Sequence, residues 1–165
     1  MPRKDDTQKL LRHWREAVPG DRLAHLIKDV SRAQMRALQS RLAAHGVSFG
    51  HWAFLRILWE QDGLTQRELS DRAGVMEPTT YTAIKAMEAQ SLLERRRLPS
   101  NRKNQYVHLT TEGRALKDLL VPLAEDVNRV SVQGLPAAQV AATRKLLLAM
   151  LNNLAQDEAG EIRAG

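Results

Sequence analysis

The fold is decided by residues 64–90, which read LTQRELSDRAGVMEPTTYTAIKAMEAQ. The segment Thr65-Gln66-Arg67-Glu68 has the spacing of a capping box, in which the Thr hydroxyl and the Glu carboxylate satisfy the free backbone donors that begin a helix. We expect this short helix to end at Gly74. A second helix should open at Glu77-Pro78-Thr79, because Pro fits the first turn and Glu favours the positive end of the helix dipole. Two short helices joined by a tight, Gly-containing turn predict a helix-turn-helix.

The second of these helices has two distinct sides. The side expected to face the core carries Thr80, Ile84 and Met87. The side expected to face solvent carries Thr79, Tyr81, Thr82 and Lys85. A helix that lies in the major groove of DNA reads base edges, so the solvent-facing residues are candidate base contacts.

Strand-like stretches follow the helix-turn-helix at residues 92–98 and 105–109, separated by a polar loop over residues 99–104. They predict a hairpin with a basic tip. Between positions 95 and 103 the charged residues are Arg95, Arg96, Arg97, Arg102 and Lys103, with no acid among them. A hairpin of one sign repels itself unless a counter-charge is near, and DNA phosphates would supply one. We therefore take Arg95, Arg97, Arg102 and Lys103 as candidate DNA contacts. The alternative is a solvated edge strand whose arginines prevent aggregation.

Helices are expected on both sides of this region. Their expected extents are residues 7–18, 22–44, a third helix from Ser48 to the break at Asp62-Gly63, a long helix capped by Thr110 and bent at Pro122, and a last helix opened by Leu135-Pro136. The fold class is therefore mainly α with a small β-hairpin wing.

Composition limits the function classes. The 165 residues fit one compact protomer, and an aromatic share of only 4% favours a helical core. The net charge of +6 favours a polyanionic partner, nucleic acid or an anionic membrane surface. The lack of cysteine excludes disulfides and thiolate zinc sites. No apolar run is long enough to span a bilayer, so we expect a soluble, cytoplasmic protein.

Several motifs together resemble the MarR (multiple antibiotic resistance regulator) family. They are Leu64 to Leu69, Ala73-Gly74-Val75, Leu92-Leu93-Glu94-Arg95, and Asn101-Arg102-Lys103 through Leu109-Thr110 and Gly113. The resemblance runs from about residue 23 to residue 154. It implies a triangular homodimer with intertwined terminal helices, two winged domains on a pseudo-palindromic duplex, and an effector pocket between the dimerisation and DNA-binding parts.

The same resemblance assigns one residue and exposes departures. Arg102 matches the wing-tip arginine that enters the minor groove in the family. Asn101 and Lys103 replace the Asp and Arg that usually flank it and stiffen the wing. Ser91 stands where the family commonly has Gly, and Ser adopts a left-handed cap conformation only at some cost.

By resemblance, the helix that begins after Ser48 walls the effector pocket. His51, Trp52 and Arg56 on this helix suit a small aromatic acid, with the ring stacking and the charge pairing. Arg22, His25 and Arg36 on the preceding helix are further candidates. The alternative is that Trp52 belongs to the core and His51 caps the helix or faces solvent. Residues 7–18 pack on the dimer, cap the pocket, or form a basic arm on DNA.

The domain organisation expected from these patterns is an extension at 1–20, a dimerisation helix at 21–47, the winged domain at 48–112, terminal dimerisation helices at 113–157 and a tail at 158–165. The favoured function is a dimeric DNA-binding regulator, a repressor released by a small aromatic acid. The alternatives are a regulator without an effector and a protein-interaction module that has lost DNA binding. No catalytic motif, cofactor fingerprint or histidine pair with metal-ligand spacing is present, so we expect no enzyme, cofactor or metal.

Overall fold

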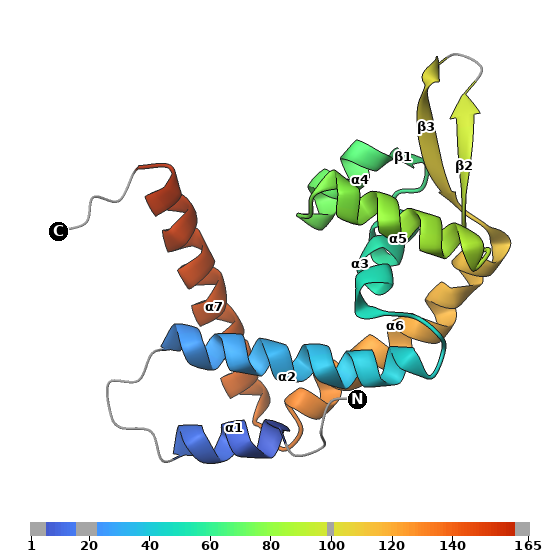
Figure 1. Ribbon diagram of the computed structural model, residues 1–165. Coiled ribbons are helices and arrows are strands. Elements are labelled where there is room, and N and C mark those ends of the chain that lie inside the picture. Colours follow the sequence, from blue (N-terminus) through green and yellow to red (C-terminus); the bar gives the residue numbers. More distant parts are fainter. Residues whose placement is uncertain (1–5, 16–22, 99–100, 161–165) are drawn as a thin grey trace. The chain divides into compact units, whose positions relative to one another are not determined.

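We describe residues 6–15, 23–98 and 101–160 of a computed structural model, leaving aside the side chains of Asp6, Leu98 and residues 101–104. The elements in Figure 1 are α1 (Asp6–Arg15), α2 (Leu23–Ala43), α3 (Phe49–Glu60), β1 (Leu64–Thr65), α4 (Gln66–Ala73), α5 (Glu77–Ala89), β2 (Leu93–Leu98), β3 (Asn101–Leu109), α6 (Thr111–Ser131) and α7 (Ala137–Glu158). The chain divides into two compact units, Met1–Val127 and Asn128–Gly165. The expected fold class, helices with a small antiparallel wing, is confirmed.

The helix-turn-helix forms as its sequence signals predict. The Glu68 carboxylate accepts from the Thr65 backbone N–H at 2.8 Å, and the Thr65 hydroxyl accepts from the Glu68 N–H at 3.3 Å, which completes the capping box. Gly74 ends α4 in the left-handed region with φ of 64°, a conformation that costs glycine nothing. On α5 the side chains of Thr80, Ile84 and Met87 are fully buried. These local predictions are confirmed.

The sheet is larger than expected. It has three strands in the order β1-β3-β2, because Leu64 and Thr65 pair with Val107 and Tyr106 of β3. Sequence patterns did not reveal so short a strand. The second strand of the hairpin was expected to begin at Gln105. Strand β3 begins earlier, at Asn101, which pairs with Leu98 of β2. The register then shifts, so residues 102–104 face no residue of β2.

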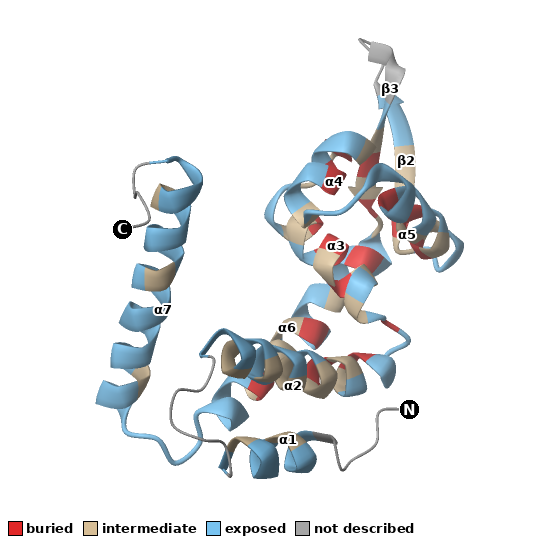
Figure 2. Ribbon diagram, turned by 60° about the vertical axis from the view of Figure 1, so that its left-hand side comes forward, coloured by how far each residue is buried: buried red, intermediate tan, exposed pale blue. Residues whose placement is uncertain are grey.

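Most buried residues lie where α3, α4, α5 and the strands meet, and the same core continues into α2 and α6, as the red segments of Figure 2 show. Residues 49–109 are called the winged domain below. The first turn of α6 is held against it, because Trp59 donates to the Gly113 carbonyl at 2.9 Å and Thr110 caps α6 through the Gly113 N–H. A Cβ at Gly113 would lie 2.1 Å from the Leu92 carbonyl oxygen, so only glycine permits this approach.

Asp62 ties together segments far apart in the sequence. One carboxylate oxygen accepts from the backbone N–H groups of Gly63 and Leu109, and the other pairs with Arg114 at 2.7 Å. His108 lies 3.7 Å from the same second oxygen. Burial alone would raise the pKa of Asp62, but the hydrogen bonds from Leu109, Arg114 and Gly63 outweigh it and lower the pKa. The carboxylate therefore joins the end of α3 to β3 and to α6.

Helix α1 packs on α2. The Trp14 indole donates to Asp29 at 3.1 Å, and Arg36 donates to the Thr7 hydroxyl at 3.3 Å. Helix α1 was expected to reach Val18, but residues 16–22 lie outside the described part of the chain, and α1 is described to Arg15.

Helix α7 follows Pro136, which occupies the N-cap position as the Leu135-Pro136 pair predicted. None of its residues is buried. Helix α6 runs through Pro122 without ending there, as expected. Over the described ranges, no helix combines the length and apolar character needed to cross a membrane.

Candidate nucleic-acid interface

Strand alternation sorts the wing residues onto two faces. Leu93, Leu109 and Val107 are buried, so their face of the hairpin points towards the helices. Arg95 and Arg97 fall on this inner face by the period of two. Arg96 falls on the opposite face, where it pairs with Glu94.

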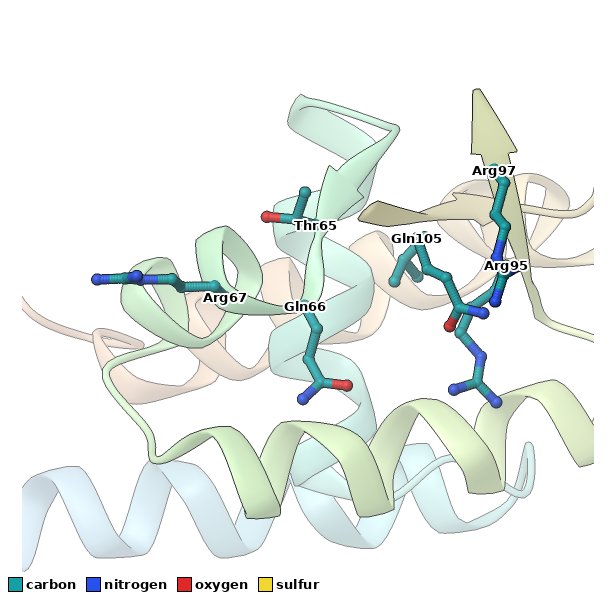
Figure 3. Close-up of a pocket in the computed structure, with 7 residues that line it drawn as sticks. Thr65, Gln66, Arg67, Arg95, Arg97 and Gln105 are labelled. Carbon is teal, nitrogen blue, oxygen red and sulfur yellow. The ribbon is translucent and has the colours of Figure 1, made fainter. Parts of the chain in front are cut away.

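A basic notch separates the wing from the start of α4 (Figure 3). Its volume is about 640 Å³. The lining residues are Thr65, Gln66, Arg67, Arg95, Arg97, Gln105 and Val107. No carboxylate is among them, so the notch suits an anion. Sequence reasoning missed Gln66, Arg67 and Gln105, although a basic residue at the start of the first helix of a helix-turn-helix is a signal that could have indicated Arg67.

The outer side of α5 is exposed at every position where base contacts were expected. Thr79, Tyr81, Thr82 and Lys85 all face solvent. The Thr82 hydroxyl donates to the Pro78 carbonyl at 3.0 Å, so it can present only its lone pairs outward. Pro78 and Glu77 in the first turn begin the helix without a side-chain cap from Met76.

Counter-charges for the hairpin lie within the protein. Arg95 donates to both carboxylate oxygens of Glu88, at 2.8 and 2.6 Å, and Arg96 pairs with Glu94. The hydrogen bonds to Glu88 raise the pKa of the Arg95 guanidinium, and partial burial opposes this only in part. The expectation that the arginines of the hairpin depend on phosphates for neutralisation is therefore wrong for Arg95 and Arg96. Arg97 is exposed and pairs with none of the described residues.

Two of the expected wing contacts, Arg102 and Lys103, belong to β3. Their side chains lie outside the described part of the chain. At the base of the wing, Ser91 has φ of 58°. It therefore adopts the left-handed conformation, which costs serine more free energy than glycine, as expected from the sequence.

The candidate effector residues His25, His51, Trp52 and Arg56 line neither the notch nor the cavities between α1 and α2. Trp52 is 5% exposed and packs edge-on against Trp59 with ring centroids 5.6 Å apart, which places it in the core. Arg56 and His25 are exposed, and Arg22 lies outside the described residues. His51 is half-buried, and its Nδ1 is buried with no hydrogen-bond partner among the described residues. Burial lowers the pKa of His51.

Two further cavities lie between α1 and α2. An apolar one of about 130 Å³ is lined by Leu10, Trp14, Leu26 and neighbouring residues. The adjoining one, of about 340 Å³, is lined by Lys9, Leu10, Asp29, Arg32 and Arg36. Neither includes His51, Trp52 or Arg56. Across the described ranges no cluster of three or more His, Cys, Asp or Glu side chains is placed to hold a metal ion.

Comparison with known proteins identifies similar chains. Residues 47–104 match the model of the MarR family. The HTH-type transcriptional regulator TtmR of Methylorubrum extorquens is 32% identical over 82 residues, which span 50% of this chain but only 42% of that regulator. The homoprotocatechuate degradative operon repressor of Escherichia coli is 26% identical over 96 residues, 58% of this chain and 65% of that repressor.

Among solved structures, that of Bordetella bronchiseptica BpsR, described as regulated in its DNA binding by 6-hydroxynicotinic acid, superposes with a TM-score of 0.68 at 24% identity. The superposition covers 79% of this chain and 98% of BpsR. At this identity the likeness concerns the fold.

Proposed function

We propose that this chain, a member of the MarR family of transcriptional regulators, binds double-stranded DNA as a homodimer and represses transcription. The observation that carries DNA binding is the pairing of an exposed α5 with an acid-free basic notch beside it. In this arrangement α5 occupies the major groove, the wing reaches the flanking minor groove, and a backbone phosphate fits the notch beside Arg67 and Arg97.

Dimerisation is supported by the apolar surface of the terminal helices. Leu151 and Leu154 of α7 are 63% and 58% exposed in the single chain. Burial against a second copy would remove this surface from water. Helices α2 and α6 also expose apolar side chains, including Val30 and Val130. Twofold symmetry then places two copies of α5 on one face of a pseudo-palindrome, with half-sites about 10 base pairs apart.

The test begins with selection from a pool of random duplexes and footprinting on the most enriched one. Protection of two symmetric half-sites is expected, whereas protection of one asymmetric site, or no enrichment, would contradict the proposal. Arg97→Ala should weaken binding to all sequences and lower the salt slope by about one unit, because a phosphate contact carries little base information. Arg102→Ala should have the same two effects on affinity and salt slope. Lys85→Ala and Thr82→Ala should instead change the preferred sequence.

An aromatic acid is the proposed effector. Two similar proteins support this, since one is named for a homoprotocatechuate operon and the other is described with 6-hydroxynicotinic acid. In this chain the buried, unpartnered Nδ1 of His51 is a polar group that a ligand could satisfy, with Arg56 on the next turn of α3 as a charge partner. Trp52 would contact the ligand from the core side and would not stack over it, because its ring is already packed on Trp59.

The effector proposal requires unequal affinity for two arrangements of the dimer, since a ligand that binds both equally shifts nothing. A thermal-shift screen of monocyclic aromatic acids identifies a binder, and a gel shift on the selected duplex measures release. Coupling of about 5- to 150-fold is expected, and DNA must weaken ligand binding by the same factor.

Location is tested by paired variants. His51→Phe should abolish the response while DNA binding persists, whereas Arg36→Ala, in the cavity between α1 and α2, should leave the response intact. The opposite result would move the effector to the α1–α2 cavity. A screen without any binder would favour a regulator that responds to no small molecule.

A further inference from the structure

One arginine of the wing is engaged with the recognition helix rather than with solvent. The Arg95 guanidinium donates from Nε and Nη2 to the two carboxylate oxygens of Glu88, and it lies 5.9 Å from the centroid of the Tyr81 ring. Glu88 and Tyr81 are seven residues apart on α5, so they share one stripe about two turns apart. Figure 3 shows the Arg95 side chain reaching from its strand towards α5.

The contact joins two elements that approach DNA separately. Arg95 belongs to β2, which forms the wing, whereas Tyr81 belongs to the exposed side of α5. The chain between them turns at Ser91, whose φ of 58° is unfavourable for a non-glycine residue. A bidentate ion pair across this turn opposes the strain and limits how far the wing can swing from the helix.

The ion pair also changes what Arg95 can offer a phosphate. Side-chain exposure is 29% for Arg95 and 23% for Glu88, so both charges are partly desolvated. If Arg95 left the pair for a phosphate, Glu88 would remain as an unneutralised carboxylate beside the DNA backbone. Arg97, two residues further along the same face, is exposed and has no such partner.

The Arg95 guanidinium also orders the Tyr81 side chain. Tyr81 is 47% exposed, and a tyrosine at such a position would otherwise sample several rotamers. A guanidinium over the ring holds it by a cation–π contact while the edge and hydroxyl stay open to a base or a sugar-phosphate. A preordered side chain loses less entropy when it binds.

We propose that Arg95 is a positioning residue which, through Glu88 and Tyr81, locks the wing to the recognition helix and sets sequence discrimination without neutralising a phosphate. The proposal rests on the proposed function, since it assumes that α5 and the wing bind DNA. It replaces the initial assignment of Arg95 as a DNA contact of the same kind as Arg97.

The first measurement uses the protein without DNA. Backbone hydrogen exchange of residues 93–97 should quicken about five- to tenfold in Arg95→Met, because the wing loses its attachment to α5. Arg97→Met is the matched control, and its exchange should not change. Equal exchange in the two variants would overturn the proposal even if the protein bound no DNA.

The second measurement compares affinity for the most enriched duplex with affinity for its shuffled sequence over a salt series. The double variant Arg95→Met with Glu88→Gln removes both charges of the pair, so it should lower this ratio about five- to tenfold, the size of one weakened side-chain contact, and leave the salt slope unchanged. Arg97→Met should do the reverse, lowering the slope by about one unit with the ratio unchanged. Arg95→Lys should lose discrimination as the double variant does, because lysine cannot make the bidentate pair.

Rescue distinguishes positioning from contact. The exchange of Glu88→Arg with Arg95→Glu restores the ion pair with its charges reversed, so it should return the hydrogen exchange of residues 93–97 to near the wild-type rate and recover part of the lost discrimination. If the charge-neutral double variant lowers the salt slope as Arg97→Met does, and the exchanged pair recovers nothing, Arg95 is a direct phosphate contact and the proposal fails. Absence of any enriched duplex for the wild-type chain contradicts the proposed function instead, and the exchange data still decide the ion pair.

Discussion

The winged domain and α7 both contain many leucines but differ in how the leucines are covered. In the winged domain Leu55, Leu58 and Leu69 are at most 1% exposed, whereas Leu151 and Leu154 of α7 are 63% and 58% exposed. The three helices and three strands of the winged domain therefore surround a buried core, which Leu38 and Leu42 of α2 and Leu120 and Val127 of α6 extend. Helix α7 has the composition of a core helix without buried residues in one chain. A single chain thus covers the leucines of the winged domain but leaves those of α7 exposed, which is typical of an interaction surface.

The largest expected effect removes the proposed assembly surface. The double variant Leu151→Glu with Leu154→Glu should make the protein monomeric, because each leucine buried at an interface is worth about 1.5–3 kcal/mol. Sedimentation equilibrium measures this. The matched control, Asn152→Glu with Asn153→Glu, adds the same charge to the same turn of α7 and should stay dimeric. A dimeric leucine variant would show that α7 does not hold the dimer.

The next effect compares the contribution of the buried core to stability with that of α7. In the monomeric background, Leu69→Ala should cost about 2–5 kcal/mol of unfolding free energy, because Leu69 is fully buried and the truncation leaves a cavity. Leu148→Ala, 47% exposed on α7, should cost within about 0.5 kcal/mol in the same background. Urea denaturation compares the two. Similar losses would mean that α7 packs as tightly as the winged domain in the monomer.

A smaller effect is expected at Asp62, which joins the end of α3 to β3 and α6. Asp62→Asn should destabilise the protein by about 1–2 kcal/mol at neutral pH, because Asp62 accepts backbone hydrogen bonds and pairs with Arg114. The folded-state pKa of Asp62 is lowered from its ordinary value of 3.8, so its contribution is present above that value and is lost as the pH falls through the lower, folded-state pKa.

The difference in unfolding free energy between wild type and Asp62→Asn should therefore shrink in acid below about pH 4. Asp71→Asn, an exposed aspartate on α4, serves as the control and should change stability little. A difference that stays constant from neutral to acid pH would show that the carboxylate charge of Asp62 contributes nothing.

The smallest effect lies inside the helix-turn-helix. Ser70 donates to the Thr80 hydroxyl at 2.7 Å, and both residues are buried between α4 and α5. Thr80→Val keeps the shape but removes the hydroxyl, so a loss of about 1 kcal/mol is expected. Thr79→Val, the exposed neighbour, should be nearly neutral. Thermal unfolding followed by circular dichroism measures both, and equal effects would mean that the buried hydrogen bond is not stabilising.

Structural features that depend only on residues close in the sequence were predicted correctly. The Thr65–Glu68 capping box, the left-handed Gly74 and the buried side of α5 all formed as predicted, because each depends on neighbours within about one helical turn. The family resemblance rested on the order of such signals and was confirmed. The roles of His51 and Arg56 and of the wing-tip Arg102 remain predictions.

What the tertiary structure alone decided depends on residues that meet from distant or separately folded segments. The pairing of β1 with β3 and the Asp62 cluster join positions more than 40 residues apart, and no local pattern encodes such a meeting. The hairpin was predicted to lack a counter-charge because its charges were considered without the helix that packs beside it. In the folded chain the acid that neutralises Arg95 comes from α5, so the sequence determined the charge of the wing, and the packing of the wing on α5 determined how much of that charge is left for a partner.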